Sequence, residues 1–164
     1  SQSILLTSDE RLAERLPEVI EQCLAKLPRQ EMMRRSLSHS HVILLADDDE
    51  MLAFANEYAP EHLIINTANA DALAELVTNA GSVFIGPYSP ESAGDYASGT
   101  NHTLPTSGYA KAYSGVNIDS FTKKITFQRL TRDGLRAIGR AVEVMAESED
   151  LMAHRMAVTV RMNK

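Results

Sequence analysis

The sequence has 164 residues and a net charge of −6, from 16 basic and 22 acidic side chains. This length predicts one domain with a hydrophobic core and room for a small appendage. The acidic balance and the lack of a basic run argue against a nucleic-acid-binding surface. No apolar run approaches the roughly 20 residues that cross a bilayer. Because the first residues also lack the pattern of a signal peptide, we expect a cytoplasmic protein with no membrane partner.

Short apolar runs alternate with amphipathic stretches along the first part of the chain. The apolar runs predict buried strands at residues 4–6, 41–46, 62–65 and 82–86. The stretches between them predict helices at residues 9–27, 30–38, 47–58 and 69–77. Pro17 falls inside the first helix, where it predicts a kink or a restart. Cys23 follows the apolar spacing of the same helix and is expected to be a core thiol.

The repeated strand–helix–strand order predicts a parallel sheet with right-handed crossovers. We therefore expect a doubly wound α/β unit over residues 1–116, with about four parallel strands. The second strand is apolar throughout, as expected for a strand that is covered on both faces. No G-x-G-x-x-G sequence follows a strand and no Walker A sequence is present, so the motifs place no nucleotide cofactor on this chain.

The remainder, residues 117–164, has a different pattern. Alternating Ile125, Phe127 and Leu130 predict an exposed strand or ribbon over residues 122–130. Two amphipathic helices are expected after it, the first capped by Thr131 and the second beginning at Leu151. This tail is too small to have a core of its own, so it should pack on another domain or another subunit.

The most unusual stretch runs from Gly81 to Ser107. It begins as a buried strand and continues as a long loop rich in Gly, Ser, Pro and Thr, with Glu91, Asp95 and His102 along it. Long loops in compact domains are usually functional or disordered, and the turn formers here favour an ordered one. Polar groups after an apolar strand mark the usual ligand position in an open α/β sheet.

Several side chains could perform chemistry, although spacing alone does not establish it. Glu61 and His62 could transfer protons, but neighbouring strand residues point to opposite faces, which favours a structural role. Asp95 and His102 are possible zinc ligands with a weak spacing signal. Glu149 and His154 fall on or beside a helix, where such residues are commonly solvated. These observations alone predict a ligand-binding α/β domain.

Three longer segments carry a family resemblance. They are NEYAPEHL at residues 56–63, GSVFIGPYSPESAGDYASGTNHTLP at residues 81–105, and AESEDLMAH at residues 146–154. In these segments, and over nearly its whole length, the chain resembles the histidinol dehydrogenase family. The resemblance implies a zinc-dependent homodimer, built from incomplete Rossmann-like domains, that oxidises L-histidinol to L-histidine with two NAD⁺ through a bound aldehyde.

The resemblance also implies roles for six residues. Glu61 and His62 match the catalytic pair: His62 takes the alcohol proton, and Glu61 activates water on the aldehyde. Asp95 matches a zinc ligand, and His154 matches a zinc ligand that the partner subunit provides through an exchanged tail. The residues that match positions near the substrate are His62, Asp95, His102, Glu149 and His154. We expect Glu61, His62, Asp95 and His102 to lie together at the carboxyl edge of the sheet.

The resemblance further implies that part of the active centre lies outside this chain. Two more zinc ligands of the family, a glutamine and a histidine, precede the sequence that matches Ser1, and its NAD-binding residues lie earlier still. The chain therefore corresponds to the C-terminal portion of such an enzyme and should be inactive by itself. The alternative is a non-catalytic α/β module, derived from that enzyme, that binds a partner or a small ligand.

Overall fold

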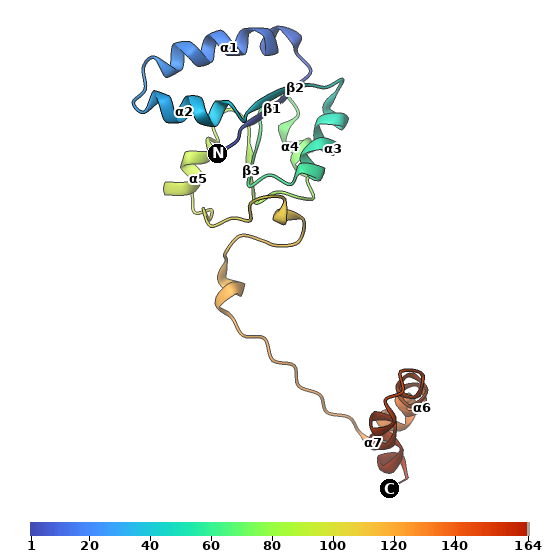
Figure 1. Cartoon of the computed structure of the whole chain (residues 1–164). Coiled ribbons are helices and arrows are strands. Elements are labelled where there is room, and N and C mark those ends of the chain that lie inside the picture. Colours follow the sequence, from blue (N-terminus) through green and yellow to red (C-terminus); the bar gives the residue numbers. More distant parts are fainter. Residues whose placement is uncertain (164) are drawn as a thin grey trace. The chain divides into compact units, whose positions relative to one another are not determined.

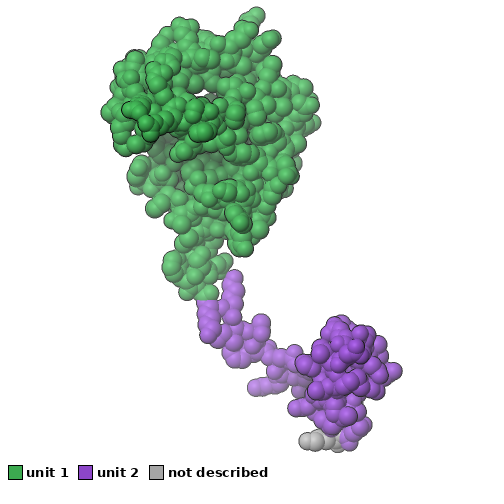
Figure 2. Space-filling view, in the orientation of Figure 1, with its two compact units in different colours: residues 1–122 green, residues 123–164 purple. Residues whose placement is uncertain are grey.

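Four short strands alternate with helices in the first part of the computed structural model, which describes residues 1–163 (Figure 1). The chain divides into two compact units, residues 1–122 and 123–164 (Figure 2). The sequence had placed this boundary between residues 116 and 117. The elements of the first unit are β1 (Ile4–Thr7), α1 (Glu10–Leu24), α2 (Gln30–Leu37), β2 (His41–Leu44), α3 (Asp48–Tyr58), β3 (His62–Ile65), α4 (Ala70–Ala74), β4 (Ser82–Ile85), α5 (Glu91–Tyr96) and two 3₁₀ turns, η1 (Tyr109–Lys111) and η2 (Ile118–Phe121).

All strand pairing in the described residues is parallel, as the strand–helix order predicts. β1 pairs with β2, from Ile4 opposite His41, and β3 pairs with β4, from His62 opposite Ser82. The expectation of four strands in one sheet is wrong, because the described residues form two separate two-stranded sheets. Apolar runs reveal where strands form, but they carry no information about which strands become neighbours. α1 lies against the β1–β2 sheet and α4 against the β3–β4 sheet.

Helix ends in this unit follow ordinary capping chemistry. The Asp9 side chain accepts hydrogen bonds from the first backbone N–H groups of α1, and Asp47 does the same for α3. These caps satisfy N–H groups that have no partner inside the helix. α1 continues through Pro17 as a single helix. No described helix combines the length and the apolar character needed to cross a membrane.

Burial is concentrated around the β3–β4 sheet. The largest buried apolar side chains there, Ile65 and Phe84, come one from each strand. By contrast, Val42 and Leu44 of β2 are 41% and 50% exposed, so the prediction that this strand is covered on both faces is wrong. Cys23 is also exposed rather than buried in the core. The apolar spacing of these segments indicates a preference for burial. The described residues do not cover these side chains.

The turn from α3 into β3 is held by unusual backbone geometry. Ala59, at the C-terminal cap of α3, has φ of 53° and is 1% exposed. A left-handed conformation is costly for a residue with a Cβ and persists only where the surroundings fix it. The Glu61 carbonyl accepts a hydrogen bond from the Ser82 N–H at 2.9 Å. The residues leading into β3 and β4 are therefore bound to each other where both strands begin.

Asn56 adds a second tether between α3 and the segment before β4. Its Oδ1 accepts hydrogen bonds from the backbone N–H groups of Thr78 and Asn79 at 2.8 and 3.3 Å. Its Nδ2 donates to the Leu76 carbonyl at 3.2 Å. One amide side chain thus satisfies three backbone groups in a segment without regular structure, which fixes the approach to β4.

The second unit is a helical hairpin of α6 (Arg132–Ser148) and α7 (Met152–Met162). α6 is capped by Thr131, whose hydroxyl accepts from the Gly134 N–H at 3.0 Å. Glu143 is buried between the helices, where the Thr159 hydroxyl donates a hydrogen bond to it. The expectation of an exposed strand or ribbon over residues 122–130 is wrong as far as a strand is concerned, because these residues form no regular element. A single ribbon with no neighbouring strand cannot satisfy its backbone groups by pairing.

Gly81 provides a test of the joint between β3 and β4. A Cβ at this position would lie 2.5 Å from the Glu61 carbonyl oxygen, which belongs to the backbone and cannot turn aside. Gly81→Ala should therefore separate the strand beginnings and lower the free energy of unfolding by about 1–3 kcal/mol. The measurement is urea denaturation followed by circular dichroism.

Gly86→Asn is the matched control, since a Cβ at Gly86 meets nothing within 4 Å and its φ of +82° is one that Asn tolerates. This control should lose less stability than Gly81→Ala. Equal losses in the two variants would show that the close approach at Gly81 is not the constraint.

Candidate functional site

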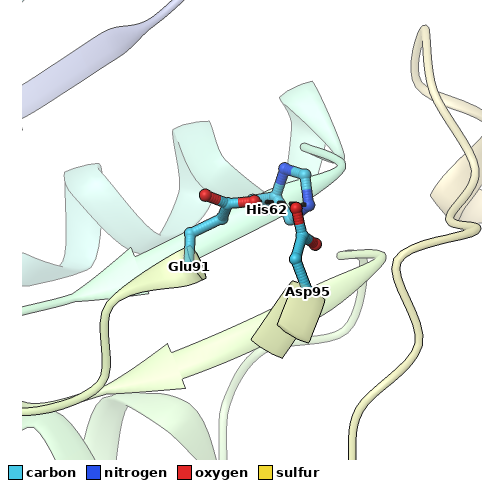
Figure 3. Close-up of side chains that lie close together, drawn as sticks. All are labelled: His62, Glu91 and Asp95. Atoms are coloured by element: carbon cyan, nitrogen blue, oxygen red, sulfur yellow. Dashed lines mark ion pairs between the residues drawn. The ribbon is translucent and has the colours of Figure 1, made fainter. Parts of the chain in front are cut away.

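Three side chains of the first unit converge at the start of β3. His62 is the first residue of that strand, while Glu91 and Asp95 lie on α5. One ligand atom from each lies within 4.8 Å of those of the other two, and all three residues are half-buried. Figure 3 shows both carboxylates directed toward the imidazole. The group combines an imidazole with two carboxylates, which suits proton transfer or cation binding.

The local sequence explains how α5 brings its carboxylates to His62. Glu91 and Asp95 are four residues apart, so they share one face of the helix. α5 packs closely on β4, because a Cβ at Gly94 would lie 2.6 Å from a ring carbon of Phe84. The hydroxyl of Ser89 donates to the Ile85 carbonyl at 2.7 Å and fixes the turn between strand and helix.

The position of the cluster differs from the sequence expectation. His62 begins β3, and its partner Ser82 begins β4, so the cluster lies beside the amino ends of these strands rather than at their carboxyl edge. The expected long loop after β4 contains α5, which returns the chain to this end by Glu91. Rules for open α/β sheets assume that functional groups remain at the edge where the strand ends. The assumption fails here because the short helix α5 carries Glu91 and Asp95 back to the opposite edge.

The other expected site residues are not in this cluster. Glu61 is half-buried directly before His62 and contributes to the electrostatic field at Glu91. His102 is exposed and lies after α5. Glu149, the C-terminal cap of α6, and His154, in the first turn of α7, are exposed residues of the second unit.

Glu91 is a cluster member that sequence reasoning did not assign to the site. The signal was its four-residue separation from Asp95, which places two carboxylates on one helical face. The surrounding glycines, prolines and serines predict turns instead of a helix. The four-residue separation therefore did not indicate a shared helical face. Within the described residues, this cluster is the only group of three or more His, Cys, Asp or Glu side chains close enough to hold a metal ion.

The carboxylate of Asp95 alters the protonation of Glu91. A hydrogen bond with Asp95 raises the pKa of Glu91, and desolvation and the negative charge of Asp95 act in the same direction. The positive charge available on His62 lowers the same pKa by a smaller amount. The pKa of Glu91 is therefore higher in the folded chain than in the unfolded chain, because a second negative charge beside Asp95 is unfavourable.

His62 itself is only partly satisfied. Its Nε2 is buried and has no hydrogen-bond partner among the described residues. The Glu91 Oε1 lies 3.8 Å from it, too far for a hydrogen bond. The ring is also tilted against Phe84, with centroids 6.0 Å apart. An unsatisfied nitrogen held beside two carboxylates has the donor chemistry of a zinc site and the geometry of a proton-transfer site.

The repulsion between Glu91 and Asp95 predicts a pH-dependent stability. Because the pKa of folded Glu91 is raised, its stabilising contribution is present at low pH and is lost as pH rises through that pKa. Glu91→Gln removes the charge and keeps the shape, so it should raise the melting midpoint at pH 7 and change it less at pH 4. The measurement is thermal denaturation in the presence of a chelator.

Glu57→Gln is the control for this comparison. Glu57 forms an exposed ion pair with Lys111 at 2.6 Å, far along the chain from α5. Its neutralisation should give no stabilisation at pH 7. If Glu91→Gln gave the same shift at both pH values, the repulsion would not be the cause.

Comparisons with known proteins identify the family. The histidinol dehydrogenase family model matches residues 1–162. A histidinol dehydrogenase of Bacteroides thetaiotaomicron is 58% identical over 163 residues, which are 99% of this chain and 38% of that protein. The Salmonella typhimurium enzyme is 48% identical over 163 residues, again 99% of this chain and 38% of that protein.

The fold agrees with this assignment. The crystal structure of histidinol dehydrogenase from Elizabethkingia anophelis matches with a TM-score of 0.89 and 52% identity, covering 99% of this chain and 38% of that one. The chain thus spans well under half the length of these relatives, 38% in each case. Sequence and structure together show that the chain belongs to the histidinol dehydrogenase family.

Proposed function

We propose that this chain forms the C-terminal portion of a histidinol dehydrogenase, an oxidoreductase of histidine biosynthesis that oxidises L-histidinol to L-histidine. The observation that carries the proposal is the convergence of His62 with Asp95, residues from separate motifs of the family sequence. A base beside a candidate metal ligand is what oxidation of an oriented alcohol requires. The family match over residues 1–162 supports histidinol as the proposed substrate.

The reaction needs two oxidations. In the first, the carbinol loses a hydride and its hydroxyl proton, and gives the aldehyde. In the second, the hydrated aldehyde loses a hydride and two protons, and gives the carboxylate. Two NAD⁺ accept the two hydrides, four electrons in all, while zinc, when bound, anchors the substrate's imidazole and amine. The nucleotide site is proposed to lie in the part of the family's length that this chain does not span.

The chain's own residues divide the remaining work. His62 accepts the hydroxyl proton as the hydride leaves, and its confined ring gives this base a fixed direction. Glu61, adjacent to it, accepts a proton from the water that adds to the aldehyde. His102 and Glu149 bind polar groups of the substrate. Asp95, with its carboxylate in the cluster, is a ligand for zinc, and an imidazole–carboxylate environment fits that metal.

His154 is proposed as a second zinc ligand, donated by the partner subunit of a homodimer through exchanged tails. Several apolar side chains of the α6–α7 hairpin are exposed, among them Ile138, Met145 and Met156. Apolar surface of this kind is typical of an interface. In the proposed dimer, the small second unit obtains the burial that its own residues do not provide. The proposed location is cytoplasmic.

The activity test uses a protein to which the upstream part of a relative has been added. We expect residues 1–164 alone to produce no NADH from histidinol, NAD⁺ and zinc. A joined protein, with the upstream part of the Bacteroides thetaiotaomicron relative fused before Ser1, should oxidise histidinol. His62→Ala in that protein should lower kcat by about 10²–10⁴-fold, the usual contribution of a general base.

His39→Ala is the matched control, since His39 is an exposed histidine outside the cluster. The kcat of this variant should remain within about twofold of that of the unmodified joined protein, because His39 takes no part in proton transfer. A folded joined protein that binds NAD⁺ but never oxidises histidinol would favour the alternative, a non-catalytic module. Turnover by the 164-residue chain alone would contradict the need for the upstream part.

Zinc binding gives a readout that does not depend on turnover. Asp95→Asn should lower the zinc retained by the joined protein after gel filtration, because a neutral amide is a poorer zinc ligand than a carboxylate. Asp71→Asn, at an exposed residue of α4, should leave the zinc content unchanged. Equal zinc in all three proteins would remove Asp95 from the ligand set.

A further inference from the structure

The unsatisfied nitrogen of His62 points to a role for its neighbour. Two buried side-chain polar atoms lack partners in the described part of the chain, His62 Nε2 and Arg155 Nε. Arg155 still pairs through another nitrogen with Glu147 at 3.3 Å. His62 has no such compensation, and a buried polar group without a hydrogen bond is costly. A partner for Nε2 is therefore required when the site is assembled.

Glu91 is placed to be that partner. Its Oε1 is 3.8 Å from His62 Nε2, so a movement of about 1 Å would form a hydrogen bond of normal length. The Glu91 side chain is 36% exposed and has three rotatable bonds, whereas the His62 ring is 28% exposed and lies against Phe84. The carboxylate can therefore move to the ring more easily than the ring to the carboxylate. Catalytic hydrogen bonds are often long until the substrate is bound.

We propose that Glu91 is the positioning residue for His62. Its carboxylate accepts the Nε2–H hydrogen bond, fixes the orientation of the ring and leaves the lone pair on Nδ1, where the hydroxyl proton of the substrate is received. Once that proton is transferred, the imidazolium lies beside a negative charge that stabilises it. This inference rests on the proposed function, because it takes His62 as the base. Glu91 is thereby distinguished from Glu61, which acts on water in the second oxidation.

The same arrangement explains why Asp95 is not the partner of Nε2. Asp95 is the residue assigned to the metal, and a carboxylate that binds zinc has less negative charge to offer an imidazole N–H. Glu91 is one helical turn before it, on the same face of α5. Two carboxylates with separate tasks, one for the metal and one for the base, account for both acidic residues of the cluster.

A spectroscopic test addresses the hydrogen bond without any need for turnover. The joined protein, labelled with ¹⁵N-histidine and mixed with histidinol in the absence of NAD⁺, should show a downfield Nε2–H proton for His62 that exchanges slowly with water. Glu91→Ala should lose this signal, and Glu91→Asp, with a shorter side chain, should weaken it. Glu57→Ala should retain it, because Glu57 pairs with Lys111 away from the cluster. Circular dichroism would verify that the variants are folded.

Two results would overturn the proposal. One is a signal that survives Glu91→Ala. The other is a signal lost in Asp95→Asn but kept in the Glu91 variants, which would make Asp95 the partner. The absence of a slowly exchanging Nε2–H in the unmodified joined protein with histidinol would also count against it.

Kinetics of the joined protein provide the second readout. Glu91→Gln should lower kcat by about 10–100-fold with KM within about threefold, since the residue acts through His62 in the transition state and not on substrate binding. Glu91→Asp should restore part of the loss. If the joined protein fails to oxidise histidinol, the proposed function fails, while the Nε2–H signal still decides whether Glu91 holds His62. If it turns over and Glu91→Gln is as fast as the unmodified protein, the positioning role is refuted.

Discussion

The close approach of Gly81 to the Glu61 carbonyl is the constraint on which the candidate site depends. Without a side chain, Gly81 lets the segment before β4 come within hydrogen-bonding reach of the turn before β3. That contact sets the register that places His62 opposite Ser82. It also fixes the position of Phe84, on which α5 rests, and α5 carries both carboxylates. One backbone contact therefore decides where the imidazole and the acidic groups meet.

Much of the secondary structure was predictable from the sequence, and the arrangement of the site was only partly so. Apolar runs correctly predicted the four strands and their parallel direction, because these depend on local patterns and on connections through helices. The meeting of His62 and Asp95 was expected from the family resemblance and not from spacing. The place of Glu91 in the cluster was missed, since α5 forms within a segment whose glycine and prolines favour turns. Tertiary packing of Gly94 on Phe84 supports a helix there that local propensity does not.

The errors in the fold have a common physical origin. Hydropathy predicted that β2 would be covered on both faces and that residues 122–130 would form an exposed strand or ribbon. In the structure, Leu44 is 50% exposed and the tail ribbon has no regular structure. Both predictions assumed neighbours that the described residues do not provide. A sequence pattern records the environment that a segment prefers, while the element that forms depends on which partners are present. This chain spans 38% of the length of its relative. The preferred environment of a segment and the environment that it finds can therefore differ.

The cluster around His62 contains unfavourable interactions. A requirement for stability alone would not preserve them. Asp95 raises the pKa of Glu91, and the His62 Nε2 is buried without a partner among the described residues. Replacing either carboxylate by a neutral side chain would relieve the repulsion at little structural cost, because both are only half-buried. Such conflicts persist where the charged groups have a task that outweighs their cost. A cation at Asp95 and a proton on His62 would each place positive charge among these carboxylates, so the arrangement that is unfavourable in the chain by itself becomes favourable when the proposed reaction occurs.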